Sequence, residues 1–154
     1  MKKLQNLKIR QKKLKQYLLI KKVNVIAKLG TCKNCGAFGR ITAHHKVKRS
    51  KQTALIKCKN NLIDLCDQCH YVIHHSPAGH KLDINIQLSF QNFLETKFLK
   101  EFISRKEVKE VLEITDRETN RLLKTLMQHN GLYEREELIR CCMGGKIITQ
   151  EDLK

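Results

Sequence analysis

The chain has 154 residues, with 31 Lys and Arg against 15 Asp and Glu, and it carries a formal net charge of +16. Its longest apolar runs fall far short of the roughly 18 residues that a transmembrane helix needs, and its N-terminus lacks the pattern of a secretion signal. These features argue against a membrane or secreted protein and favour an intracellular one. Aromatic residues make up only 5% and Trp is absent, so we expect a small core that needs further stabilisation.

The first predicted element is a basic helix over residues 1–30. Residues 2–29 contain no Gly or Pro, apolar residues recur mostly at three- and four-residue steps, and Gly30 follows as a helix stop. Residues 1–81 together hold 19 basic and 2 acidic residues. So basic a segment favours a polyanionic partner, with nucleic acid first and an anionic membrane surface second. A solvated face kept for solubility is the alternative.

The second segment, residues 31–81, contains two Cys-x-x-Cys motifs. They are formed by Cys32, Cys35, Cys66 and Cys69. An odd total of seven cysteines favours a reducing compartment, where paired thiols bind metals more often than they form disulfides. Four thiolates close the coordination of a tetrahedral Zn²⁺, so the motifs predict a structural zinc site. The remaining cysteines are interpreted as small buried residues; they are Cys58, Cys141 and Cys142.

The third segment, residues 82–103, contains four of the five Phe residues and is predicted to be an amphipathic helix that serves as core or as a helical spacer. In the last segment, residues 104–154, a capping box at Ser104 opens a helix to about Leu112. A second helix, capped by Thr115 or Asp116, is expected to run toward Gln128 and to be closed by Asn130 and Gly131.

Two short helices joined by a tight turn are typical of a helix-turn-helix module. Its second helix carries side chains suited to base edges and phosphates; these are Arg117, Asn120, Arg121 and Lys124. A helical hairpin that packs or dimerises is the alternative interpretation, since this half of the chain is almost neutral.

Histidines lie between and after the cysteine motifs. His44 and His45 are adjacent, and on an extended segment they would point to opposite sides. His70 and His74 are four residues apart, so on a helix they share one face and can share a metal ion. One imidazole can thus hold a cation while another accepts a proton from water, a division of labour that suits phosphodiester hydrolysis.

This order of Cys-x-x-Cys, His-His, Asn-Leu-x-x-Leu-Cys-x-x-Cys-His and a further His resembles the zinc-containing form of HNH, or His-metal finger, endonucleases. The resemblance covers residues 31–75 and implies an α+β fold in which a β-hairpin and a helix clasp one divalent cation, Mg²⁺ or Mn²⁺ first and Zn²⁺ or Ni²⁺ second. It also implies a phage or mobile-element origin, because the form is common in phage and homing endonucleases.

Carried over by position, the resemblance makes His44 and His70 metal ligands and His45 the general base. His74 would be a third ligand or a phosphate contact. Asn61 would pin the loop and orient the base; Asn60 competes for that role, and the nine-residue spacing to His70 favours Asn61. The Pro after the His pair and the Gly-Gly before the Asn, common in the family, are absent.

Four basic residues replace them, and they would suit a strand along the phosphate backbone, with an exposed charged hairpin as the alternative. They are Lys46, Lys48, Arg49 and Lys51. We therefore expect a zinc-stabilised, metal-dependent endonuclease acting on double-stranded DNA. A non-catalytic zinc-containing DNA-binding or regulatory protein is the alternative, and an RNA-binding zinc protein is less favoured because stacking aromatics are scarce in the basic half.

Overall fold

The computed structural model describes residues 28–153, so most of the expected N-terminal helix lies outside the described residues. Its last residues correct the expectation, because Leu29–Thr31 forms strand β1 and pairs with β2. Gly30 is not a helix stop. A β-carbon at Gly30 would lie 2.4 Å from the end of the Ile41 side chain, so the glycine lets β1 pack closely.

The cysteine and histidine motifs lie on a strand–strand–helix unit. Strand β2 (Phe38–His45) pairs antiparallel with β1 and with β3 (Leu62–Cys66), in the order β1-β2-β3. Two short 3-10 helices, η1 (Thr53–Leu55) and η2 (Lys59–Asn61), lie in the connection between β2 and β3. Helix α2 (Asp67–His75) follows β3 directly. The expected α+β class is therefore confirmed for the described part of the chain.

Ser76 separates α2 from α3 (Pro77–Lys97), which begins five residues before the predicted spacer helix and ends six before its predicted end. The Ser76 hydroxyl donates to the carbonyl of Val72 (2.9 Å) and accepts from the amide of Gly79 (3.0 Å), so it closes one helix and caps the next. Pro77 stands at the first position of α3, where its missing N–H costs nothing.

The C-terminal segment contains two short helices in the predicted places. Ser104 caps α4 (Arg105–Leu112), and Thr115 forms a capping box with Glu118 at the start of α5 (Asp116–Leu123). Helix α5 ends at Leu123, well short of Gln128.

A two-stranded sheet in this segment was not predicted. Strand β4 (Phe102–Ser104) pairs antiparallel with β5 (Leu132–Glu134), which leads into α6 (Arg135–Cys142). Asn130 and Gly131 both have positive φ, 53° and 81°. They therefore form the turn that returns the chain to β5, and they do not end a helix.

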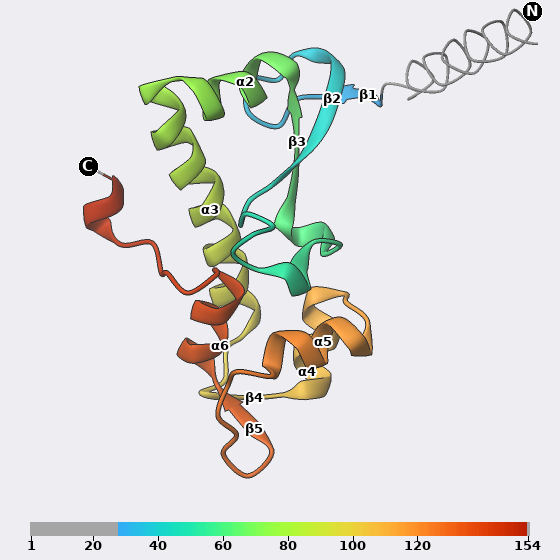
Figure 1. The fold of residues 1–154 in the computed structure, drawn as a ribbon, viewed down its shortest axis with the longest axis vertical. Coiled ribbons are helices and arrows are strands. Elements are labelled where there is room, and N and C mark those ends of the chain that lie inside the picture. Colours follow the sequence, from blue (N-terminus) through green and yellow to red (C-terminus); the bar gives the residue numbers. More distant parts are fainter. Residues whose placement is uncertain (1–27, 154) are drawn as a thin grey trace, which may run out of the picture.

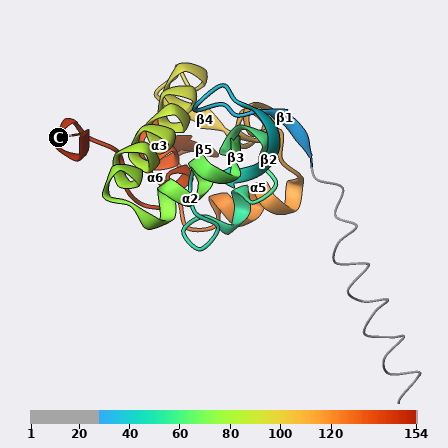
Figure 2. The same cartoon turned by 90° about the horizontal axis from the view of Figure 1, so that it is seen from above.

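One hydrophobic cluster joins segments that the sequence pattern separates. It contains Leu55 from the β2–β3 connection, Phe90 from α3, Leu112 from α4 and Leu122 from α5. In Figure 1, α3 runs from α2 at one end of the molecule to the C-terminal helices at the other, and Figure 2 shows α3 beside α6. Residues 82–103 therefore form part of the core, which is one of the two predicted roles, and residues 104–153 pack on the same cluster.

We expect Leu122→Ala to destabilise the protein by about 2–5 kcal/mol, because it opens a cavity in this shared cluster. Leu122 is only 1% exposed. Urea denaturation followed by circular dichroism measures the change. Met127→Ala, at a side chain 68% exposed, is the control and should change stability little. A loss no larger than that of the control would show that α5 is not part of the core.

Candidate metal centres and histidine cleft

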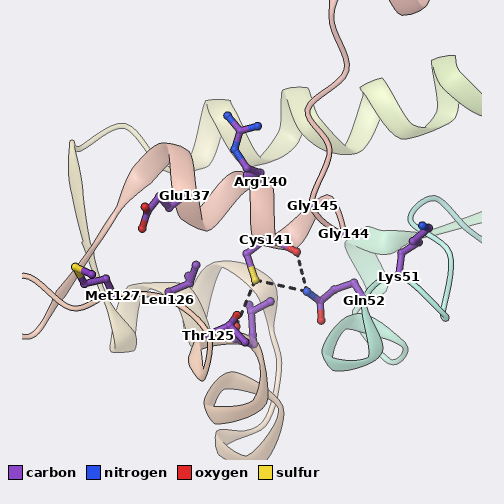
Figure 3. Close-up of a pocket in the computed structure, with 11 residues that line it drawn as sticks. Lys51, Gln52, Thr125, Leu126, Met127, Glu137, Arg140, Cys141, Gly144 and Gly145 are labelled. Carbon is purple, nitrogen blue, oxygen red and sulfur yellow. Dashed lines mark hydrogen bonds between the residues drawn. The ribbon is translucent and has the colours of Figure 1, made fainter.

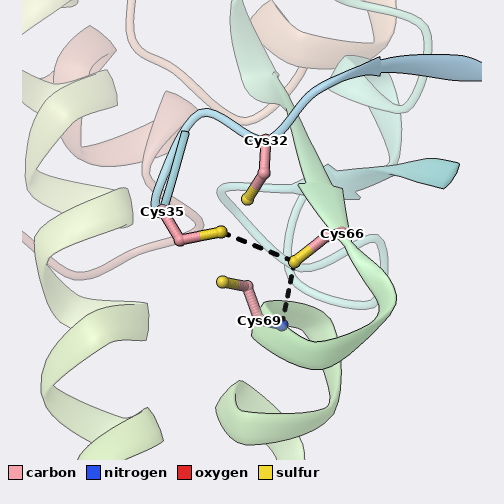
Figure 4. Close-up of side chains that lie close together, drawn as sticks. All are labelled: Cys32, Cys35, Cys66 and Cys69. Atoms are coloured by element: carbon pink, nitrogen blue, oxygen red, sulfur yellow. Dashed lines mark hydrogen bonds between the residues drawn. The ribbon is translucent and has the colours of Figure 1, made fainter. Parts of the chain in front are cut away.

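The four motif cysteines lie together where β1, β3 and α2 meet. Their sulfur atoms all lie within 4.8 Å of one another, and Figure 4 shows the side chains pointing toward a common centre. The Sγ atoms of Cys35 and Cys66 are 3.7 Å apart. Zinc–sulfur bonds of about 2.3 Å in a tetrahedron place sulfurs about 3.8 Å apart. The cluster is thus positioned to bind a metal ion and is consistent with structural zinc.

The two buried thiols of the cluster, Cys32 and Cys69, have pKa values shifted in opposite directions. Burial raises the pKa of Cys32, but backbone amides of Cys35, Cys66 and Asn34 lower it more, so its pKa lies below the ordinary value. The Asn34 side chain donates to Cys69 Sγ (3.3 Å) and lowers the pKa of that thiol, yet burial and the neighbouring sulfurs raise it overall. A divalent cation would stabilise all four as thiolates.

The three other cysteines lie away from this cluster, as predicted. Cys58 and Cys142 are fully buried, and the Cys58 thiol donates to the carbonyl of Leu112 (3.3 Å). Burial raises the pKa of Cys58, Cys141 and Cys142. These thiols are therefore packing groups with little thiolate character.

We expect Cys66→Ser to lose the bound metal and to unfold the strand–strand–helix unit, because metal sites of this kind contribute about 10 kcal/mol or more to folding. Metal analysis and circular dichroism test this. Cys141→Ser, at a cysteine outside the cluster, should retain the metal. A folded Cys66→Ser protein that still holds one ion per chain would contradict the assignment.

A second cluster is formed by three histidines. His44, near the end of β2, meets His70 and His74 of α2, with ring centroids 4.9–5.6 Å apart. One nitrogen from each lies within 4.8 Å of the other two. Burial and the neighbouring histidines lower the pKa of His70, so its lone pair is available at neutral pH. The residues fit a divalent cation held by imidazole ligands.

A buried carboxylate that the sequence analysis missed lies beside His44. Oδ1 of Asp83, on α3, is 3.8 Å from His44 Nε2. Both residues are more than nine-tenths buried, and neither of these two atoms has a hydrogen-bond partner among residues 28–153. Burial raises the pKa of Asp83, but His44, Lys48 and Gln87 lower it more. Nothing in the motif spacing pointed to this residue.

His45 and Asn61 are linked through the β2–β3 connection. The buried Asn61 side chain accepts from the Val47 amide (2.8 Å) and donates to the carbonyls of Val47 (3.3 Å) and Leu55 (3.1 Å). His45 Nε2 lies 3.0 Å from the carbonyl oxygen of Ile56, the residue after Leu55. Asn61 therefore pins the segment that carries the partner of His45.

Asn60 does not share this arrangement. It lines a separate shallow pocket with residues of α3 and α4. Of the two asparagines, Asn61 is the one whose side chain forms hydrogen bonds to Val47 and Leu55 in the β2–β3 connection.

The four basic residues after His45 do not form a strand, which corrects the expectation. Strand β2 ends at His45, because Val47 turns into the core and the amides of Lys51 and Gln52 bond the carbonyl of Lys48. Lys48 and Arg49 are exposed and line a cleft of about 620 Å³ that also holds His44, His45, His70 and His74. Lys46 is half-buried, and burial lowers its pKa.

The predicted base-reading side chains are exposed on α5 and at the residue that follows it. They are Arg117, Asn120, Arg121 and Lys124. Leu122 and Leu123 on the opposite face are buried. Asn120 accepts a hydrogen bond from Arg105 Nε (3.0 Å), so its carbonyl oxygen is already engaged.

A cavity of about 680 Å³ lies elsewhere, between α5, α6 and the β2–β3 connection. Lys51 lines it, away from the histidines. Figure 3 shows Gln52 bridging its wall, where Nε2 donates to the carbonyl of Cys141 (2.7 Å). The cavity lies at the contact between the connection and the C-terminal helices, and no histidine lines it.

No family model matches this chain, and the comparisons with curated proteins and with solved structures found no significant similarity. The resemblance to His-metal finger endonucleases therefore stays a hypothesis based on this chain's own residues. None of the helices within residues 28–153 combines the length and apolar character that a bilayer span requires.

Proposed function

We propose that the histidine cleft is the active site of a metal-dependent endonuclease that hydrolyses phosphodiester bonds of double-stranded DNA. The observation that carries the proposal is the contrast between two adjacent residues of β2. His44 is buried against His70 and His74, whereas His45 is held by the carbonyl of Ile56 and lines the same cleft. Ligand and base thus come from neighbouring positions of one strand.

The contact of His45 with Ile56 determines which ring nitrogen can act as a base. A carbonyl oxygen only accepts hydrogen bonds, so Nε2 must carry the hydrogen. The neutral ring then has its lone pair on Nδ1, which would accept the proton of the attacking water. Asn61 supports this orientation through Leu55, next to the carbonyl that His45 contacts.

The cation of the cleft would be held by His44, His70 and His74. When bound, it would neutralise charge on the scissile phosphate and stabilise the leaving oxygen. Imidazole ligands suit transition ions better than Mg²⁺, so this ligand set favours Mn²⁺ over Mg²⁺ and keeps Ni²⁺ and Zn²⁺ as candidates. For the cysteine cluster we propose Zn²⁺ in a structural role, because four thiolates leave no position open for substrate.

The proposed DNA surface consists of Lys48 and Arg49 at the cleft and the exposed face of α5. Lys48 and Arg49 would position a phosphate beside the histidines, whereas Arg117 and Arg121 on α5 suit phosphates or guanine edges. A non-catalytic zinc-containing DNA-binding protein would use the same basic side chains, but it would have no use for a base held by Ile56.

We expect His45→Ala to lower cleavage of supercoiled plasmid about 10²–10⁴-fold, because it removes the proton acceptor. Conversion to nicked or linear DNA is measured in Mn²⁺ and in Mg²⁺. Zinc content and DNA affinity should stay unchanged, and His80→Ala, at an exposed histidine on α3, is the control. Wild-type turnover by His45→Ala would refute its role. A gel shift without cleavage by the wild type in any divalent metal would favour the non-catalytic alternative.

We expect Lys48→Ala with Arg49→Ala to flatten the dependence of log K on log salt by about 0.9 for each phosphate that these side chains neutralise. Arg117→Ala with Arg121→Ala tests the α5 face in the same way. Fluorescence anisotropy with duplex DNA at several salt concentrations gives the slopes. The control pair is Lys97→Ala with Lys100→Ala, at the last residue of α3 and just after it, which should leave the slope unchanged. If all three double variants keep the wild-type slope, DNA binds to a different surface of the protein.

A further inference from the structure

Asp83, whose carboxylate oxygen Oδ1 lacks a hydrogen-bond partner among the described residues, lies outside the strand–strand–helix unit that carries the histidines. It belongs to α3, and its Oδ1 faces Nε2 of His44 at 3.8 Å. Both atoms are buried and lack a hydrogen-bond partner among the described residues. Buried polar groups are nearly always paired, because an unpaired one keeps the full cost of leaving water. The pair is therefore one small movement away from a hydrogen bond that satisfies both atoms.

The other carboxylate oxygen of Asp83 already has partners. Oδ2 accepts from Gln87 Nε2 at 3.1 Å, one turn further along α3. Lys48 Nζ, on an exposed side chain, lies 3.8 Å from the same oxygen. These two contacts engage Oδ2, and Oδ1 is left facing His44.

Asp83 does not share the metal-binding geometry of the histidines. The nitrogens of His44, His70 and His74 lie within 4.8 Å of one another, and Asp83 is not part of that group. An imidazole has two nitrogens on different edges of its ring. When one nitrogen of His44 donates a hydrogen bond to the carboxylate, the other nitrogen is free to bind the cation.

We propose that Asp83 is a positioning residue of the histidine centre, which accepts the Nε2 hydrogen of His44 and thereby presents Nδ1 of His44 to the cation. This inference depends on the metal centre of the proposed function, though not on DNA cleavage. A carboxylate behind a ligating histidine fixes its tautomer, orients its ring and raises its basicity. Helix α3 thus supplies the support for a ligand that β2 carries.

The test is a titration of the zinc-loaded full chain with Co²⁺, followed by its visible absorption, and with Mn²⁺ by calorimetry. We expect Asp83→Ala to weaken binding of both ions about 10- to 100-fold. Asp83→Asn keeps an oxygen that can accept the His44 hydrogen, so it should lose less. Glu95→Gln removes a negative charge from the same helix more than three turns away and is the matched control, with unchanged affinity.

Two readouts separate positioning from other roles. At saturation, the Co²⁺ spectrum of Asp83→Asn should match that of the wild type; a changed spectrum would make Asp83 a direct ligand and overturn the proposal. Before Co²⁺ or Mn²⁺ is added, the thermal midpoint of the zinc-loaded Asp83→Asn protein should not fall below that of the zinc-loaded wild type. A fall with unchanged metal affinity would show a purely structural role and would also overturn it.

The outcome for Asp83 is independent of the outcome for cleavage. If the wild type binds Co²⁺ but cuts no DNA, the endonuclease proposal fails and the affinities still decide the role of Asp83. If the wild type cuts DNA and Asp83→Ala binds both ions with wild-type affinity, the Asp83 proposal fails and the endonuclease proposal stands.

Discussion

The buried amide of Asn61 holds the connection between β2 and β3 in place, and both the core and the cleft depend on that connection. Its three hydrogen bonds to Val47 and Leu55 are made inside the protein, where no water could replace them. Removing one partner of such a bond costs about 1–3 kcal/mol for each group left unpaired. With Asn61 in place, Val47 and Leu55 enter the shared hydrophobic cluster, and the carbonyl of Ile56 comes to His45.

Helix α2 connects the two candidate metal centres. Cys69 contributes a thiol to the cysteine cluster, and the next residue, His70, contributes a nitrogen to the histidine cluster. The start of the helix is also fixed by the cysteine motif, since Cys66 Sγ accepts from the amide of Cys69 (3.5 Å). An ion bound to the cysteines would therefore hold the helix that presents His70 and His74. Both candidate metal centres therefore depend on the position of α2.

The features that local chemistry determines could be predicted from the sequence. The Cys-x-x-Cys motifs bring four thiols together, the caps at Ser104 and Thr115 begin α4 and α5, and the four-residue spacing of His70 and His74 puts their rings side by side on α2. Each of these depends on residues close together in the sequence or on a spacing with one simple geometric meaning.

The features that were missed depend on contacts between distant segments. Asp83 meets His44 across 39 residues, and only the packing of α3 against α2 brings it there. Strands β4 and β5 have three residues each, too few for an alternating pattern to stand out. The basic turn after His45 was expected to be a strand because its charges suggested a backbone-binding surface, whereas the inward Val47 sets its actual course.

The contact between α2 and α3 at Gly79 has a consequence for how the histidine centre keeps its dimensions. A β-carbon at Gly79 would lie 1.9 Å from the carbonyl oxygen of Val72, so the backbones of the two helices touch with no side chain between them. His74 and Asp83 stand close to this touching point along the chain, one before it and one after it. The distance between the two helices at this crossing is therefore set by contact between their backbones. Unlike side chains, backbones cannot relieve a close contact by changing rotamer. Any methyl group inserted there would wedge the helices apart, and the separation of carboxylate and imidazoles would widen with them.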